Sequence, residues 1–430
     1  MKYRVGEFSS LSQAEFSVVK RLGLEAVIAS RAELILTAGA SEPQNPGQNL
    51  QTTQGQWLGI KADAALLAAV NGGGLREAAR FLAQVRQDFA ATVLLDLCPE
   101  VCFALVESSL DDRAGRLDLL LFDLGFVRLR TGLLTGRRLY LRSDLLDDLS
   151  LLGEAPLERR ISMSSLGSNG RFANQLFQYI FLRLYGLRNN CRVLTPEWIG
   201  NHLYRIERES LPTDEPGLPM LQFQPFAGAE LGLWYTDQPP IQVDFWGYFQ
   251  VIPASYRHHR RLIQRLLRPV PEVARPIEQW LNSQLPAGAT TVGIHIRRGD
   301  YVQLAPRVNE FRTVPLAPYL TALRELWPQL EQPRLVIATD APELVPEFQD
   351  YDPLVAPAAL LSFEPWGFFP DFHALSSCDH IFVVNSSFSR MASLLAKEST
   401  IVKIIDMTEQ RFKPYSPWDD VYFWDRFEEE

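Results

Sequence analysis

Apolar residues in the second part of the chain follow two different spacings. Between Phe172 and Tyr185 they recur in pairs every three to four positions, which predicts an amphipathic helix. Elsewhere, short apolar runs of five or six residues predict strands, and they span Ile161–Leu166, Thr291–Ile296, Arg334–Thr339, Ile381–Asn385 and Thr400–Ile405. Because these strands alternate with helical segments, we expect an α/β fold with parallel sheets.

The chain before residue 156 follows a looser pattern. Helical spacing at Leu75–Phe89 and short apolar runs at Ala91–Leu97 and Leu117–Phe122 predict a small additional N-terminal α/β region. Residues 38–56 are rich in Gly, Pro, Asn and Gln and lack apolar periodicity, which predicts an exposed loop. We find no chemical motif in residues 1–155, so their role is unassigned.

A second stretch rich in proline and glycine, Pro212–Pro240, interrupts the α/β pattern. It predicts an insertion or a boundary between two lobes. The length of 430 residues agrees with two or three domains.

Composition and charge exclude several classes of protein. With 47% hydrophobic and 22% charged residues, the chain has the composition of an ordinary globular protein. Its formal net charge is −9, which disfavours a general nucleic-acid binder, because such proteins need a basic face. A binding site for an anion must therefore be local.

The basic residues are mostly arginine. The six lysines leave the whole span between Lys61 and Lys397 without any, so phosphate recognition there would use guanidinium groups. A P-loop is excluded because Ala62 and Glu398 follow these two lysines where that motif needs Ser or Thr.

Neither the cysteines nor the apolar segments indicate export or a membrane span. The four cysteines are too scattered for a zinc ribbon, and the first residues lack the apolar region of a signal peptide. No uninterrupted apolar run approaches 18 residues. We expect a cytoplasmic protein, and association with a membrane surface stays open.

The most specific segment is TVGIHIRRGDY, residues 291–301. Val292, Ile294 and Ile296 alternate as in a strand, and Arg297 and Arg298 follow its carboxyl end. Ligands of open α/β sheets bind at that edge, so two guanidiniums there could grip a diphosphate. The alternative is a surface turn with an Arg–Asp300 ion pair.

Two further segments could bind an anion at a helix start. The turn GSNGRFANQ, residues 167–175, offers glycines for close approach and the unpaired N–H groups of the helix that follows. Ser386 and Ser387 follow an apolar run and precede a helix expected at Arg390–Ala396. An ordinary turn and ordinary helix capping are the alternatives.

Residues typical of metal sites are poorly placed. Asp350 and Asp352 form an Asp-x-Asp, but no apolar strand leads into it, so we expect no metal there. The histidines show no ligand spacing, and we expect His258 and His259 to lie on the solvated face of an arginine-rich helix.

Taken together and in this order, the segments resemble glycosyltransferase family 11. This is the α-1,2-fucosyltransferase family, within the fucosyltransferase superfamily that carries a His-x-Arg-Arg-x-Asp motif. The resemblance covers about residues 158–430. Its carriers are GRFANQLFQYIF (170–181), FWGYFQ (245–250), VGIHIRRGDYV (292–302), VIATDAPE (336–343) and DFHALSSCDHIFVVNSSFS (371–389).

The resemblance implies a GT-B fold of two Rossmann-like lobes within residues 156–430. The first lobe would span about 156–285 and the lobe for the nucleotide-sugar donor about 286–430. It also implies an inverting transfer of L-fucose from GDP-fucose to a glycan acceptor, α-1,2 to galactose, without a metal or other cofactor. The oligomeric state is not implied.

The resemblance further implies a role for each matching residue. The catalytic candidates are Arg297, Asp300 and His295, with Asp300 orienting the arginines or deprotonating the acceptor. Alanine in place of either arginine should be crippling. The donor would be held by Arg297 and Arg298 at the diphosphate, by Ser386, Ser387 and Phe388 at the next helix, by Gly170 and Asn174 from the first lobe, and by His295 and Asp340 at the nucleoside.

Two positions depart from the family pattern. Family members commonly have Gly at the position of Ala173 and a Trp pair at that of Arg390 and Met391. These departures bear on the acceptor and the linkage. The alternatives are a catalytically silent glycan- or nucleotide-binding protein of the same fold, or a transferase with another linkage or donor. A dinucleotide oxidoreductase is disfavoured because no G-x-G-x-x-G follows an expected strand.

Overall fold

The computed structural model describes most of the chain after residue 157 and short parts of the chain before it. The described ranges are 2–6, 33–37, 57–62, 103–108, 119, 122–123, 125–129, 137–146, 149, 152–153, 155–156, 158–204, 206, 217–224, 229–234, 236, 238–304, 311–361 and 367–420. The predicted loop at 38–56, the predicted helix at 75–89 and the apolar run at 91–97 lie outside these ranges.

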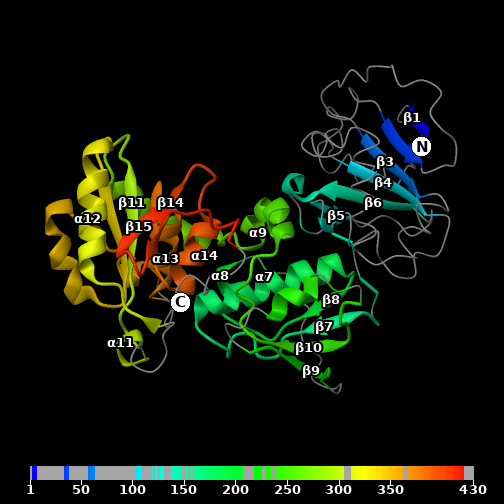
Figure 1. Cartoon of the computed structure of the whole chain (residues 1–430), viewed down its shortest axis with the longest axis horizontal. Helices are drawn as coiled ribbons and strands as arrows, with labels where there is room; N and C mark the ends of the chain where they lie inside the picture. Colours follow the sequence, from blue (N-terminus) through cyan, green and yellow to red (C-terminus); the bar gives the residue numbers. More distant parts are fainter. Residues whose placement is uncertain are drawn as a thin grey trace.

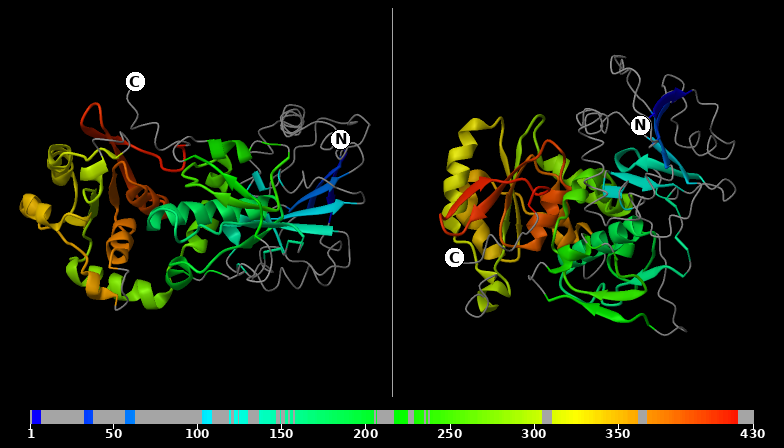
Figure 2. Two further views of the ribbon diagram at one scale, coloured as in Figure 1. Left: turned by 90° about the horizontal axis from the view of Figure 1, so that it is seen from below. Right: turned by 45° about the vertical axis from the view of Figure 1, so that its right-hand side comes forward.

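Three sheets follow one another along the longest axis of the molecule (Figures 1 and 2). The N-terminal sheet has six strands in the order β1-β2-β3-β4-β6-β5, of which β2, β3 and β4 are parallel. Its strands are β1 (Lys2–Gly6), β2 (Glu33–Thr37), β3 (Trp57–Ala62), β4 (Phe103–Ser108), β5 (Phe126–Arg128) and β6 (Arg137–Arg142).

The second sheet belongs to the first lobe and has four parallel strands in the order β8-β7-β10-β9. These are β7 (Arg160–Ser162), β8 (Arg192–Leu194), β9 (Met220–Gln222) and β10 (Val243–Trp246). The predicted strand at 161–166 is shorter than expected, because the chain turns after Met163. The Pro- and Gly-rich stretch 212–240 contributes β9 to this sheet, so its described part lies within the first lobe and not at a lobe boundary.

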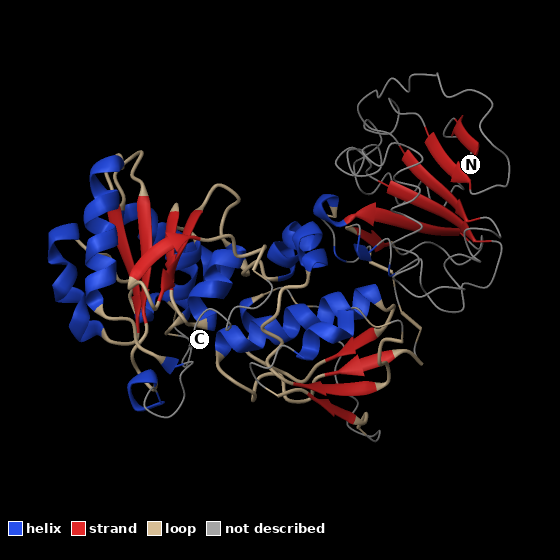
Figure 3. Cartoon of the chain, viewed as in Figure 1, coloured by secondary structure: helices blue, strands red, loops and turns tan. Residues whose placement is uncertain are grey.

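The third sheet has five strands in the order β12-β11-β13-β14-β15, and only β15 is antiparallel. The strands are β11 (Thr291–Ile296), β12 (Arg334–Thr339), β13 (His380–Val383), β14 (Ile401–Asp406) and β15 (Arg411–Pro414). Helix α12 covers one face and α13 and α14 cover the other (Figures 1 and 3). The two parallel sheets with their helices confirm the expected α/β fold of GT-B type.

Helices and 3-10 turns connect and cover these sheets. The α-helices are α7 (Phe172–Arg188), α8 (Gly200–Leu203), α9 (Arg260–Leu266), α10 (Pro271–Gln284), α11 (Tyr301–Leu304), α12 (Leu316–Leu326), α13 (Phe369–Ser376) and α14 (Ser387–Leu395). The 3-10 helices are η2 (Ser143–Leu145), η4 (Ala229–Trp234), η5 (Ala254–His259), η7 (Trp327–Gln329), η8 (Pro342–Tyr351) and η9 (Ala358–Leu360). Helix α10 packs against α13, so it lies with the second lobe.

Helix α7 is buried around most of its circumference, and not on one face as its pattern predicts. It packs on β7 and β8 of its own lobe and on α14 of the second lobe. Even Gln175 and Gln178 are buried, because their side-chain amides donate to carbonyls of the preceding turn, at Gly167, Gly170 and Asn169. The helix therefore forms part of the interface between the lobes.

Residues before 156 pack against the first lobe. Phe122, Leu129 and Leu146 belong to the same continuous core as both lobes. His259 was expected on a solvated face, but it is fully buried there. The expectation is wrong because the Phe122 ring stacks on the imidazole, with 3.9 Å between ring centres, and the Ser143 hydroxyl lies 2.9 Å from Nδ1 of His259.

Candidate active site

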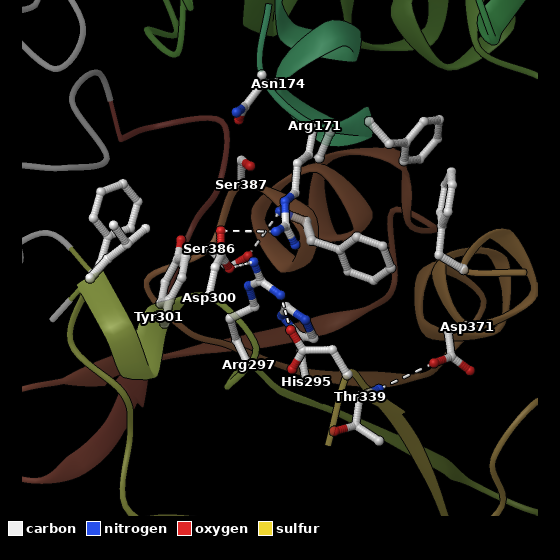
Figure 4. A pocket seen from close by; sticks show the side chains of 18 of the residues that line it. Arg171, Asn174, His295, Arg297, Asp300, Tyr301, Thr339, Asp371, Ser386 and Ser387 are labelled. Atoms are coloured by element: carbon white, nitrogen blue, oxygen red, sulfur yellow. Dashed lines mark hydrogen bonds and ion pairs between the residues drawn. The ribbon is translucent and has the colours of Figure 1, made fainter. Parts of the chain in front are cut away.

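A cavity of about 820 Å³ lies between the two lobes (Figure 4). The turn before α7 and the segment after β10 form its first-lobe wall. The carboxyl ends of β11, β12 and β13 and the starts of α13 and α14 form its second-lobe wall. The lining residues are Gly170, Arg171, Phe172, Ala173, Asn174, Tyr248, Gln250, His295, Arg297, Asp300, Tyr301, Leu304, Phe311, Thr339, Asp340, Gly367, Phe368, Asp371, Ser386, Ser387 and Phe388.

The cavity brings together nearly all of the residues selected from the sequence, although they are far apart along the chain. His295, Arg297, Asp300, Asp340, Gly170, Asn174, Ser386, Ser387 and Phe388 all line it. Arg298 does not line it. Its backbone N–H donates to Asp340 Oδ1 at 2.7 Å. Its positive charge lowers the pKa of Tyr319, which lies away from the cavity, against the larger effect of burial, which raises that pKa.

Arg297 lies at the centre of the cavity and is held by two carboxylates. Its side chain is only 11% exposed and forms ion pairs with Asp300 and Asp340. The guanidinium also lies over the Tyr301 ring, 4.7 Å from the ring centre. Gly299 makes this possible, because a Cβ there would lie 2.5 Å from Asp340 Oδ2 and 3.0 Å from Arg297 Nη1.

A second guanidinium reaches the same carboxylate from the first lobe. Arg171 Nη2 lies 2.9 Å from Asp300 Oδ2, and the Arg171 side chain is 68% exposed. Arg171 is not among the residues selected from the sequence. Its position directly after Gly170 and directly before α7 could have indicated it, because a residue at a helix start points toward whatever binds there.

The start of α14 faces the same space. Ser386 is the N-cap of this helix, and its hydroxyl accepts the Phe388 N–H at 3.3 Å. The helix thus begins at Ser387 and not at Arg390 as expected. Its free N–H groups and the positive end of its dipole favour an anion beside Ser387.

His295 and Phe388 form one wall of the cavity. Their rings lie 4.8 Å apart at an angle of 30°. Burial, followed by the charge of Arg297, lowers the pKa of His295 to about 3, so the imidazole is neutral at physiological pH. Its Nδ1 is buried and makes no hydrogen bond within the described part of the chain, which leaves this atom for a ligand.

Asp371 lies at the opposite side of Arg297 from Tyr301 (Figure 4). Its Oδ2 accepts the Thr339 N–H at 3.2 Å, and its Oδ1 has no partner among the described residues. Burial raises the pKa of Asp371 to about 7, against the effect of the Thr339 and Ala356 N–H groups. Asp371 begins one of the segments that resemble family 11, but it is not among the residues selected from the sequence.

The first-lobe wall depends on a tight turn. Gly170 has φ of +75°, and a Cβ there would lie 2.6 Å from Asn174 Nδ2. The Asn174 side chain in turn accepts a hydrogen bond of 2.5 Å from Gln250 Nε2, on the segment that follows β10. These contacts fix the amide of Asn174 against the cavity.

The described residues contain no cluster typical of a bound metal. Within them, no group of three or more His, Cys, Asp or Glu side chains could hold an ion. Asp352 of the Asp-x-Asp forms an ion pair with Arg334 on β12 instead. No helix among the same residues is both long and apolar enough to cross a bilayer.

These features define a class of site: two α/β lobes that enclose an arginine at a strand end opposite a helix N-terminus. Comparison with known proteins indicates a glycosyltransferase. Residues 240–422 match the sequence model described as glycosyl transferase family 11, which is less than half of the chain. The resemblance seen in the sequence is confirmed over these residues.

Curated relatives carry the same activity in their names. Galactoside alpha-(1,2)-fucosyltransferase 2 of Mus musculus is 30% identical over 154 residues, which are 34% of this chain and 43% of that protein. Galactoside alpha-(1,2)-fucosyltransferase 1 of Homo sapiens is 26% identical over 243 residues, which are 54% of this chain and 65% of that protein. The matches therefore span less than two thirds of these relatives.

Solved structures of fucosyltransferases are also similar. The fucosyltransferase NodZ from Bradyrhizobium is 16% identical, with 60% of this chain and 97% of that chain covered and a TM-score of 0.39. POFUT1 in complex with GDP-fucose is 11% identical, with 58% and 98% covered and a TM-score of 0.40.

Proposed function

We propose that this protein transfers L-fucose from GDP-fucose to a hydroxyl group of a glycan, α-1,2 to galactose, with inversion at the anomeric carbon and without a metal ion. One observation carries the proposal: Arg297 and the N-terminus of α14 face one cavity within the region of family 11. The names of the curated relatives support the linkage and the acceptor.

Arg297, Ser387 and the free N–H groups of α14 would bind the diphosphate. When the bond between the anomeric carbon and the phosphate oxygen breaks, its electron pair stays on GDP. A fixed guanidinium and oriented N–H groups stabilise that charge, as a divalent ion does in other enzymes. Asp300 and Asp340 hold the guanidinium in place, so little reorganisation is needed when the donor enters.

The guanine base would occupy the side of the cavity lined by Phe388, Phe368 and Asp371. Aromatic rings offer a flat surface on which a base can stack. The free Oδ1 of Asp371 is a hydrogen-bond acceptor, and guanine presents N–H donors at N1 and N2. His295 and Asp340 remain candidates for nucleoside contacts, although Asp340 is engaged by Arg297.

The acceptor would bind on the first-lobe side. Asn174, which the resemblance implies for the donor, lines this side together with Tyr248 and Gln250, and the three offer amide and hydroxyl groups that match sugar hydroxyls. The acceptor oxygen forms the new bond to the anomeric carbon and loses its proton. Each Asp300 oxygen already contacts a guanidinium, at Arg297 and Arg171, which favours the orienting role for Asp300 over that of a base.

The test is an assay of GDP release and product formation. The protein is incubated with GDP-fucose and lactose in excess EDTA, and the product is analysed by NMR for linkage and anomeric configuration. We expect an α-1,2-fucosyl product and an unchanged rate after Mg²⁺ or Mn²⁺ is added. UDP-galactose in place of GDP-fucose is the control. A rate that EDTA abolishes and a metal ion restores would contradict the metal-free proposal, and absence of any GDP-fucose binding would contradict the function.

A further inference from the structure

The environment of Arg390 is unusual for a cation. It lies in the second turn of α14, and its side chain is fully buried. A buried guanidinium is costly unless its donors are bound, so the partners of Arg390 indicate why it is tolerated.

The guanidinium leaves its own lobe and reaches the first lobe. Arg390 Nη1 donates to the backbone oxygen of Gln250 at 2.7 Å. The guanidinium carbon lies 5.3 Å from the centre of the Phe177 ring on α7. On the other side, Nη2 donates to the backbone oxygen of Asp420 at 3.0 Å. One side chain thus joins α14, α7, the segment after β10 and the C-terminal segment.

The Gln250 contact continues to the cavity. The Gln250 side chain lines the cavity and donates to Asn174 Oδ1 at 2.5 Å, and Asn174 also lines it. A continuous series of contacts therefore runs from α14, which presents Ser387 to the donor side, through Arg390 and Gln250 to Asn174 on the acceptor side.

We propose that Arg390 is a positioning residue that holds the acceptor-side wall, formed by Gln250 and Asn174, in register with helix α14. The proposal rests on the function proposed above. The bond from Nη1 to Gln250 and the contact of the guanidinium with the Phe177 ring tie α14 to the first lobe, and the bond from Nη2 to Asp420 holds the planar group in its orientation. Arg390 itself touches no substrate in this arrangement.

The expected effect is a loss on the acceptor side only. The backbone N–H of Arg390 donates to the Ser386 oxygen at 3.2 Å, and a side-chain substitution keeps this helical bond, so donor binding should persist. Small displacements of positioning groups reduce rates strongly, and we expect Arg390→Met to lower kcat/KM for lactose about tenfold or more. The Kd for GDP and the slow hydrolysis of GDP-fucose without an acceptor should stay within about threefold of the wild type. The kcat/KM of Arg390→Lys for lactose should lie between those of the wild type and Arg390→Met, because an ammonium group can replace at most one part of the guanidinium's donor pair.

The matched control is Arg188, which is the other fully buried arginine among the described residues. It is 1% exposed, forms a bidentate pair of 2.9 Å with Asp123 and does not line the cavity. Arg188→Met should lower thermal stability but leave the kcat/KM for lactose per GDP-binding site unchanged. If Arg390→Met changes activity only in proportion to the fraction of GDP-binding protein, as Arg188→Met does, Arg390 is merely structural and the proposal is wrong.

Hydrogen–deuterium exchange keeps the test independent of the assigned reaction. In Arg390→Lys or Arg390→Met, amides of residues 246–252 and 172–178 should exchange faster than in the wild type and in Arg188→Met. Unchanged exchange in both segments would overturn the proposal even if the wild type proved inactive. A wild type that transfers fucose, together with Arg390 variants that keep normal lactose kinetics, would overturn only this proposal and leave the function standing.

Discussion

Arg171 and Asp300 form an ion pair of 2.9 Å that joins the two lobes at the edge of the cavity. The other oxygen of Asp300 pairs with Arg297, so a single carboxylate holds one guanidinium from each lobe. In the proposed function, an entering diphosphate would meet both cations already oriented and would compete with Asp300 for them. The neighbouring Arg298 takes no part in this arrangement, although the sequence motif predicts the same role for both arginines.

We therefore expect unequal effects at the two arginines. Loss of one preorganised donor to a developing negative charge typically costs about 10²- to 10³-fold in rate, and Arg297→Ala should show a loss of this size. Arg298→Ala should cost less than about tenfold, because its guanidinium does not line the cavity. Arg297→Lys should recover little, since the pairs with Asp300 and Asp340 use both terminal nitrogens.

Steady-state kinetics with GDP-fucose and lactose measure these losses, and circular dichroism checks the fold of each variant. Equal and large losses at both positions would mean that Arg298 moves into the cavity when the donor binds. A well-folded Arg297→Ala that keeps more than about a third of wild-type kcat/KM has lost less than about 1 kcal/mol of transition-state stabilisation, which would remove Arg297 from the mechanism.

Asp371 should make GDP binding depend on pH. Its pKa is raised to about 7, so the carboxyl is largely protonated at pH 6 and largely charged at pH 8. A charged carboxylate accepts two N–H donors from guanine, whereas the protonated group accepts them less well. GDP should therefore bind more tightly as the pH rises from about 6 to about 8. The affinity should rise by up to about tenfold for each unit by which the pKa of Asp371 differs between the free and the GDP-bound protein.

Isothermal titration calorimetry of the wild type and Asp371→Asn at several pH values tests this expectation. The terminal phosphate of GDP titrates in the same range, but it does so equally for both proteins. The difference between their two profiles isolates Asp371. Parallel profiles would show that the carboxyl does not contact the base.

Central strands and the residues at their ends were the most predictable features. β11 and β12 begin and end where the apolar pattern predicts, because both are buried parallel strands whose core residues form uninterrupted runs. The polar residues that follow them, Arg297 and Asp340, then meet in the cavity as the topology of an open α/β sheet requires. The strand predicted at 161–166 was too long, because Met163 and Leu166 are buried in a turn, and burial alone does not distinguish a turn from a strand.

The features that the sequence did not reveal depend on contacts between distant segments. Part of the burial of α7 comes from α14, about two hundred residues later in the chain. Arg171 acquires a partner only when the two lobes face each other. The pKa of Asp371 depends on its burial beside β12, and no local pattern contains that information.

The turn at Gly170 gives a test of the first-lobe wall. In Gly170→Ala the new Cβ meets Asn174 at 2.6 Å and the backbone must keep φ of +75°, so Asn174 should be displaced and stability should fall by about 1–2 kcal/mol. Gly167→Ala is the matched control: its φ is +92° and its Cβ would meet Trp198 at 2.9 Å, outside the cavity lining. Both variants should lose similar stability by urea unfolding, and only Gly170→Ala should lose lactose kcat/KM per folded molecule. Equal kinetic losses would show that Asn174 is not the affected group.

The buried His259 should make the whole protein sensitive to acid. Its Nε2 donates to the Phe122 carbonyl at 2.8 Å, and Nδ1 lies 2.9 Å from Ser143 Oγ, so the neutral ring joins the chain before residue 156 to η5 of the first lobe. Burial lowers its pKa from 6.5 to about 3, although the hydrogen bond to Phe122 acts in the opposite direction.

The sign of the effect follows from the two states. Between about pH 6.5 and pH 3 the unfolded chain binds a proton at this histidine and the folded chain does not, so the free energy of unfolding falls as the pH falls. One such proton contributes a slope of up to about 1.4 kcal/mol per pH unit, and His295, with its pKa also lowered to about 3, contributes in the same direction. The lowered pKa values of His258, His373 and His380 act in the same direction, so His259→Gln removes one of several contributions. Its free energy of unfolding should be lower than that of the wild type at pH 7, because the stacking on Phe122 is lost, and it should fall less steeply between pH 6.5 and pH 4.5. His202→Gln, at a half-exposed side chain, is the control for the loss of an imidazole outside the core. Urea unfolding of the three proteins at pH 7, 6, 5 and 4.5 measures the slopes.

Parallel curves for the wild type and His259→Gln would mean that His259 is accessible to protons in the folded protein, and that the segment around Phe122 and Ser143 is not docked as the structure shows.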